Sequence, residues 1–209
     1  MRGFLLLLAA GVAIAADPNA PNLFYSKAFP GSDPAYIQVT VDSDGQVEYK
    51  EAPDDDLPLK FKLTDTEKTE VFALAEKLDW FKRPIESGLK VAFMGTKTFR
   101  CERGTEKHEQ QFNYSEDPAA KGLWDWFERM TESAQHRVNL DRAAKYDKLG
   151  VFKAVSQLGA AIEAKRVVGL EQYLPTLDRI IKNESYMHAA RARASEIADY
   201  IRNGKPPAQ

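Results

Sequence analysis

The sequence has a single cysteine, Cys101, among its 209 residues. This excludes an intrachain disulfide framework, so the fold has to be stabilised by packing. Apolar residues make up 44% of the chain and supply enough material for a core. In the stretch TKTFRCE, Cys101 alternates in phase with Phe99. We therefore expect its thiol to be buried and unpaired.

The chain also lacks the motifs of common catalytic and metal sites. HEQQF, from His108, has Phe112 where a zinc-protease motif has its second histidine. DSDG, from Asp42, has its glycine too early for a calcium loop, and PGSDP is not the glycine-flanked serine of a nucleophile elbow. The sequence has no glycine-rich phosphate loop. We expect no metal, no cofactor and no catalytic residue.

Long apolar runs are missing except at the N-terminus. There, Arg2 is followed by an uncharged run from Phe4 to Ala16. This run is too short to span a bilayer, because a transmembrane helix needs about 20 residues. It ends in Ala13-Ile14-Ala15, the A-x-A pattern of a signal peptidase site. We predict a signal peptide over 1–16, a periplasmic or secreted mature protein, and no stable membrane anchor after cleavage.

What the first half does contain is a pattern of short strands. AYIQVTV alternates between polar and β-branched residues, DSDGQ supplies a turn at Gly45, and VEYKE returns as the partner strand. LFYSK, from Leu23, is expected to form an edge strand, and LKFKL another short strand. TKTFRCE, RGTE and KHEQQFNY predict a second hairpin.

Two helices are predicted between and after these strands. Thr64 and Glu67 form a capping box ahead of an apolar stripe, which predicts a helix over 65–78. Asp117 followed by Pro118 is typical of a second helix N-terminus. The order of elements indicates an α+β fold, with an N-terminal antiparallel sheet of two hairpins packed against helices and an all-α helical region after it.

Beyond Thr131 the strand pattern gives way to helical stripes. The stripes consist of Val151, Phe152, Val155, Leu158 and Ile162, then Leu170, Tyr173, Leu174, Leu177 and Ile181, then Met187, Ala190, Ala194, Ile197, Ala198 and Ile201. We place an α+β domain at 22–135, an α-helical region at 136–203 and a disordered tail at 204–209.

The two halves carry opposite net charges. Residues 17–135 have 15 Lys and Arg against 23 Asp and Glu, whereas residues 136–209 have 13 against 8. The simplest interpretation is ordinary solvated surface. Alternatively, the halves are two modules that dock, and their attraction weakens with salt. Basic residues of the second half alternate with acidic ones, which argues against nucleic acid as a partner.

A loop, a strand and a tight turn in the first domain form a recognisable pattern: Gly31, Pro34 and Tyr36, then Asp44-Gly45, then Val47-x-Tyr49. Over roughly 23–130 this resembles a family of bacterial exported domains of unknown function with a C-F-G-x-C-P-x-Y loop. Phe29 and Asp33 stand at the two cysteine positions, so a redox or disulfide role of that loop does not carry over. The resemblance implies no activity. The helical extension contains a HEAT-like hairpin, but one helical pair does not make a solenoid.

The loop of that pattern is the candidate binding site, with the residues Phe29, Pro30, Gly31, Pro34 and Tyr36. Its prolines and glycine either direct the chain into the next strand or stiffen a loop beside an open sheet edge, where a partner binds at little entropic cost. We expect an exported, non-catalytic binding or scaffolding protein whose partner is a protein or a cell-envelope component. The alternatives are a small extracytoplasmic enzyme, hydrolase-like and carboxylate-based, and an inhibitor-like module that uses the Phe29 loop.

Overall fold

The computed structural model describes residue 17 and residues 19–204. The predicted signal peptide over 1–16 and the tail after Gly204 therefore lie outside the described residues. The strands are β1 (Asn22–Ala28), β2 (Tyr36–Val41), β3 (Gln46–Lys50), β4 (Leu59–Lys62), β5 (Thr96–Arg103) and β6 (Glu106–Phe112). The helices are α1 (Asp65–Lys77), α2 (Pro118–Tyr146), α3 (Val151–Glu163), α4 (Leu174–Lys182) and α5 (His188–Asn203), with short 3-10 turns η1 (Asp79–Phe81) and η2 (Leu170–Tyr173).

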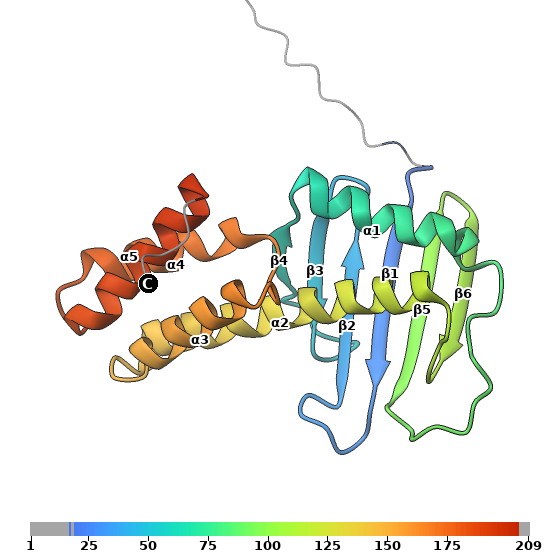
Figure 1. Cartoon of the computed structure of the whole chain (residues 1–209), viewed down its shortest axis with the longest axis horizontal. Helices are drawn as coiled ribbons and strands as arrows, with labels where there is room; N and C mark the ends of the chain where they lie inside the picture. Colours follow the sequence, from blue (N-terminus) through green and yellow to red (C-terminus); the bar gives the residue numbers. More distant parts are fainter. Residues whose placement is uncertain (1–16, 18, 205–209) are drawn as a thin grey trace, which may run out of the picture.

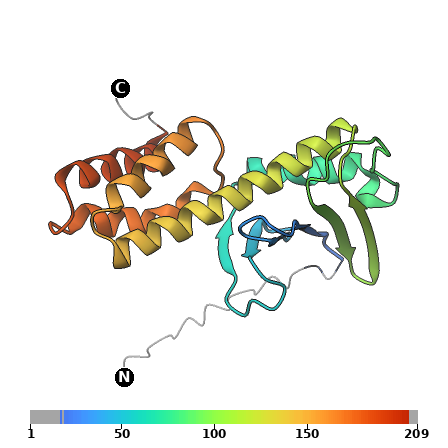
Figure 2. The ribbon, with the colours of Figure 1, turned by 90° about the horizontal axis from the view of Figure 1, so that it is seen from below.

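The strands form one antiparallel sheet in the order β4-β3-β2-β1-β5-β6. α1 and α2 lie side by side on one face of this sheet, and no helix of the described chain covers the other face (Figure 1, Figure 2). α3, α4 and α5 pack beyond the β4 side of the sheet, around the second half of α2. The predicted α+β fold with a helical C-terminal region is confirmed.

Strand alternation builds the core between the sheet and these two helices. In β2 every second residue is buried, beginning with Ile37. The pairing places Tyr25 of β1 opposite Val39 on one side and opposite Phe99 on the other. The Tyr25 ring stacks on Phe127 of α2, with 4.9 Å between ring centroids. Rows of side chains from three adjacent strands therefore meet the apolar stripe of α2.

β1 lies inside the sheet, so the prediction of an edge strand at LFYSK is wrong. β1 pairs with β2 on one side and with β5 on the other, and the edges are β4 and β6. Local alternation is the same for an edge strand and an interior one, and only the long-range pairing with β5 distinguishes them. The loop after β1 consequently does not lie beside an open edge.

Both predicted helix N-termini are confirmed. Thr64 Oγ1 accepts the Glu67 N–H at 3.3 Å, while the Thr64 N–H donates to the Glu67 carboxylate at 2.8 Å, which completes the capping box of α1. Asp117 Oδ1 accepts the N–H groups of Ala119 and Ala120 at the start of α2. These bonds satisfy backbone donors that have no partner within the helix.

Cys101 is buried in the sheet core and has no disulfide partner, as predicted. It belongs to the same hydrophobic cluster as Phe99 and Phe81. Burial raises the pKa of its thiol to about 11. The thiol therefore stays protonated, and unreactive, at neutral pH.

α2 is 29 residues long and contributes to two separate hydrophobic clusters. Its first half packs Leu123, Phe127 and Met130 against the sheet. Its second half contributes Leu140 and Ala144 to the cluster formed with α3, α4 and α5. The helix continues unbroken through the expected domain boundary at 135/136, which stays a prediction.

A loop between α3 and η2 joins the helical region to the sheet a second time. Val168 is fully buried in the cluster on the sheet side, and its N–H donates to Ser133 Oγ of α2 at 2.8 Å. Gly169 lies against the Phe61 ring and the Lys62 carbonyl of β4. The attachment therefore combines close packing with hydrogen bonds, in addition to the continuity of α2.

The three C-terminal helices follow the predicted stripes with two exceptions. Phe152 is 41% exposed and Met187 is 49% exposed. Both stand at the N-terminal end of their helix, where the stripe runs out of the core. Among the described helices, none combines the length and the apolar character that crossing a membrane requires.

Candidate functional site

A concave surface made of two neighbouring hollows runs along one flank of α2. A hollow of about 550 Å³ is lined by Tyr114, Lys121, Trp124, Asp125, Glu128 and Arg166. A smaller one of about 150 Å³ lies on the other side of Glu128, between α2 and the loop Ser32–Pro34. We call the two hollows together the α2 cleft. Its lining comes from a polar stripe at helical spacing, adjacent to the apolar stripe that faces the sheet.

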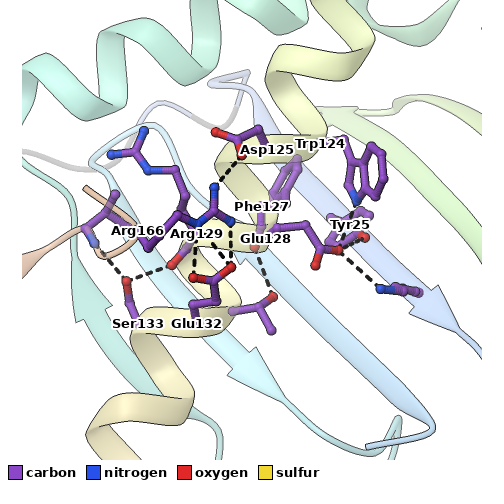
Figure 3. A network of polar contacts seen from close by, with 12 residues as sticks. Tyr25, Trp124, Asp125, Phe127, Glu128, Arg129, Glu132, Ser133 and Arg166 are labelled. Carbon is purple, nitrogen blue, oxygen red and sulfur yellow. Dashed lines mark hydrogen bonds and ion pairs between the residues drawn. The ribbon is translucent and has the colours of Figure 1, made fainter. Parts of the chain in front are cut away.

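Glu128 is the group that both hollows share, and its carboxylate is held by two hydrogen bonds and one ion pair. Tyr25 Oη donates to Glu128 Oε1 at 2.8 Å, and Trp124 Nε1 donates to the same oxygen at 2.9 Å (Figure 3). Lys27 Nζ lies 3.6 Å from it. Within the described chain, Glu128 Oε2 accepts no hydrogen bond. One oxygen is thus fixed while the other remains available as an acceptor.

Two lysines lie beneath this carboxylate, on the covered face of the sheet. Lys27 of β1 and Lys97 of β5 are register partners. Lys97 is 1% exposed; its Nζ donates to the Asn113 carbonyl at 2.7 Å and lies 4.7 Å from the centroid of the Trp124 ring. Burial, together with the nearby Lys27 charge, lowers the pKa of Lys97. A buried cation therefore stands behind the indole that helps to hold Glu128.

Burial also raises the pKa of Tyr25 well above its ordinary value, and the Glu128 charge adds to this effect. The Tyr25 hydroxyl therefore remains protonated and stays a donor to the carboxylate over the whole physiological range. Since the donor cannot lose its proton there, the orientation of Glu128 does not depend on pH through this contact.

The far end of the cleft is closed by Arg166, from the loop that follows α3. Its guanidinium lies between Asp125 and Glu132, which are two turns apart on α2 (Figure 3). Hydrogen bonds to Glu132 and then Asp125 raise the pKa of Arg166. Two of the acidic groups around the cleft are thus already paired with Arg166, whereas Glu128 is held by Tyr25 and Trp124 through one oxygen and keeps the other free.

The five residues of the sequence-predicted site do not converge on one spot. Pro34 lines the smaller hollow, next to Glu128. Tyr36 faces the uncovered side of the sheet, where its hydroxyl donates to Gln38. Pro30 and Gly31 are exposed at the tip of the loop. Phe29 lines neither hollow. Its ring packs edge-on against Phe93, with 5.9 Å between ring centroids.

Phe29 thereby belongs to an apolar surface that the sequence did not reveal. The chain before β5 exposes Leu89 (50%), Val91 (43%), Phe93 (56%) and Met94 (53%). This segment and the Phe29 loop meet at the same end of the sheet (Figure 1). We call the side chains of Phe29, Leu89, Val91, Phe93 and Met94 the end patch. GLKVAFMG has neither strand alternation with a partner nor helical spacing, so its place in the fold had no signal.

Asn113 fixes the end-patch segment to the sheet. Its side chain accepts the Met94 N–H at 2.8 Å and donates to the Ala92 carbonyl at 3.1 Å. Its own N–H donates to Glu86. Asn113 begins one of two N-x-S sequences that match a glycan acceptor site, but its amide already bonds to the neighbouring segment. The segment is therefore held in position without regular secondary structure.

Comparison of the sequence with protein-family models and with curated proteins gave no match. A function for this chain therefore has to be inferred from the α2 cleft and the end patch themselves.

Proposed function

We propose that this chain is an exported, non-catalytic binding protein that holds a protein partner through the end patch. The observation that carries the proposal is the cluster of four large apolar side chains, each 43–56% exposed, in one short segment. Exposed apolar residues that occur singly are ordinary, whereas several together in one place are typical of an interaction surface. Phe29 extends the surface onto a second loop.

The end patch is also held in place before any partner arrives. Asn113 bonds to the segment at two points, and Ser32 Oγ bonds to the carbonyls of Phe29 and Pro34 within the other loop. A surface that is already ordered loses little conformational entropy on association. This supports a binding role better than it supports a mobile lid over a catalytic centre.

Charges at the rim favour a protein over a lipid surface. On the two loops that carry the patch, Asp33 and Glu86 stand against Lys82 and Lys90, and Arg83 is already paired with Asp117. Peripheral proteins reach anionic membranes through an excess of Lys and Arg around their apolar residues. The end patch has no such excess, so we commit to a protein partner.

The carboxylate-based hydrolase is the weaker candidate. Acid–base hydrolysis with carboxylates uses two of them, one on each side of the reacting bond. In the α2 cleft Asp125 and Glu132 are both bonded to Arg166. The remaining carboxylate besides Glu128 is Asp33, an exposed loop residue that lines the smaller hollow and not the larger one. For the alternative of an inhibitor-like module, Phe29 would not enter the cleft of a target protein alone. It packs against Phe93, so both rings would have to enter together.

The test compares Phe93→Ser with Phe152→Ser. Phe152 is 41% exposed on α3 and serves as the matched control for Phe93 at 56%. Each purified variant is immobilised, exposed to the periplasmic extract of the native host, and the retained proteins are quantified by mass spectrometry. We expect one protein to be retained by wild type and by Phe152→Ser and to be lost from Phe93→Ser. Identical retention by all three would overturn the proposal.

Two further measurements separate the other occupants of the patch. Light scattering of the wild-type protein reports self-association, and sedimentation with phosphatidylglycerol vesicles reports lipid binding. If Phe93→Ser abolishes either of these while no host protein is lost, the patch binds a second copy or a membrane, and the assignment to a protein partner is wrong.

A further inference from the structure

We infer that the α2 cleft is a second, separate binding site, and that it takes a neutral saccharide. The inference does not depend on the end patch, because none of the five end-patch side chains lines either hollow, although the loop from Phe29 to Pro34 borders both surfaces. The larger hollow, about 550 Å³, falls within the range of small-molecule sites. Three features of the cleft support this ligand class: its balanced charge, its aromatic wall and the free oxygen of Glu128.

Charges around the cleft cancel. The lining contributes three cations, Lys27, Lys121 and Arg166. It also contributes four anions, Asp33, Asp125, Glu128 and Glu132. The buried Lys97 behind Trp124 supplies the fourth cation. A site with no net charge gives neither an anion nor a cation an electrostatic advantage, so the ligand that fits is polar and uncharged.

The polar groups of the cleft suit hydroxyls. Glu128 Oε2 is an acceptor only, and Lys121 is a donor only, whereas a hydroxyl both donates and accepts. A sugar therefore satisfies both groups at once, since one of its hydroxyls can donate to Glu128 while another accepts from Lys121. Lys121 and Glu128 are seven residues apart, two turns along α2, so they lie on the same side of the helix and both line the larger hollow.

The aromatic wall suits the other aspect of a sugar ring, its apolar C–H face. Tyr114 and Trp124 both line the larger hollow. Trp124 is anchored through its indole N–H to Glu128, and Lys121 lies 5.2 Å from the centroid of the Tyr114 ring. Because the same hydrogen bond fixes the ring and the carboxylate, the stacking surface and the acceptor are oriented together before a ligand binds.

The experiment follows the three tryptophan indole N–H signals by NMR in the full protein labelled with ¹⁵N. Trp124→Phe identifies the Trp124 signal, and Trp80 and Trp126 serve as internal references. The probes are chitotriose, cellotriose, maltotriose and mannotriose, with inorganic phosphate and spermidine as charged comparisons. We expect at least one trisaccharide to shift the Trp124 signal saturably, with a Kd of about 1 mM or tighter.

Glu128→Gln tests the role assigned to the free oxygen. A glutamine keeps one oxygen to accept from Tyr25 and Trp124 but replaces the free acceptor with an amide donor. We expect this variant to bind the saccharide about tenfold more weakly, equivalent to about 1.4 kcal/mol, with the reference signals unchanged. Glu76→Gln, at an exposed position on α1 that does not line the cleft, should leave the affinity unchanged.

Three results would overturn the inference. These are no shift of Trp124 with any trisaccharide, a shift with phosphate or spermidine alone, or equal affinity in wild type and Glu128→Gln. Loss of partner capture in Phe93→Ser with saccharide binding intact would show that the two sites are separate. The failure of one proposal is thereby distinguishable from the failure of the other.

Discussion

Replacing Gly169 by alanine measures how firmly the helical region is joined to the sheet. Gly169 has a φ of +59°, in the left-handed region that L-residues avoid. A Cβ atom at this position would lie 2.7 Å from the Lys62 carbonyl oxygen and 2.8 Å from Cδ2 of Phe61. Both distances are well inside van der Waals contact, so the loop and β4 have to move apart.

Gly204 provides the matched control. It has a φ of +65°, and no described atom lies within 4 Å of a Cβ built there. The left-handed backbone costs an alanine about 1–2 kcal/mol at either site. The collision adds about 1–3 kcal/mol at Gly169 only, the usual cost of overpacking. We therefore expect Gly169→Ala to lose about 1–3 kcal/mol more unfolding free energy than Gly204→Ala.

Urea unfolding followed by two probes gives both the magnitude and its meaning. Trp80, Trp124 and Trp126 all pack at the sheet-side cluster, so fluorescence reports on the sheet, whereas far-UV circular dichroism is dominated by helices in both halves. If the sheet and the helical region unfold as one cooperative unit, the two transitions coincide in wild type and shift together in Gly169→Ala. A difference of less than about 0.5 kcal/mol between the two variants would contradict a firm attachment of the helical region to the sheet. So would separate transitions in wild type.

Three smaller predictions concern the N-terminal half. Thr64→Ala should cost about 1 kcal/mol of unfolding free energy because the capping box is lost. Thr66→Ala, at an exposed position two residues further along α1, should cost less than half of that. Cys101 should resist iodoacetamide at pH 8 and react only in denaturant, because its pKa is about 11; rapid labelling of the native protein would contradict its burial. Burial acts to raise the pKa of the Asp117 carboxyl, but hydrogen bonds from Arg83 and two helix N–H groups outweigh it and lower the pKa. A carboxyl with a lowered folded-state pKa stabilises the protein above its unfolded pKa and loses this effect as pH falls through the folded value. Asp117→Asn should therefore be less stable than wild type at pH 7, and the difference in unfolding free energy should shrink as pH falls. If the variant were destabilised by the same amount at pH 7 and at pH 2, the ionised carboxylate would not be the source of the stabilisation.

Local patterns were sufficient to predict the elements of this fold. The alternation in β2 and β5, the capping box at Thr64 and the aspartate cap at Asp117 each depend on residues within a few positions of one another. The neighbours of β1 could not be predicted in this way, because its pairing with β5 joins residues far apart in the chain. Phe152 and Met187 belong to the predicted apolar stripes but are exposed. Helical spacing alone does not show where along a helix the contact with the core ends.

The candidate site was missed for a related reason. Glu128 meets Tyr25 across 103 positions of sequence, and Arg166 reaches Asp125 across 41. None of these residues belongs to a short motif. The available signal was the polar stripe of α2 at spacings of three and four, which by itself is indistinguishable from an ordinary solvated helix face. Only the sheet beneath and the Arg166 loop beside it make that stripe concave.

The interior position of β1 also has a consequence for the order in which the sheet assembles. β1 begins at Asn22, but its second partner begins at Thr96, so one side of the first strand waits for roughly 70 residues of chain to be made. During that interval β2 to β4 can form, while the backbone N–H and C=O groups along the other side of β1 have no partner. An unpaired side of this kind is a template for pairing with another chain. A fragment that stops at Gly95 would present it permanently, and we expect that fragment to aggregate where the complete protein does not.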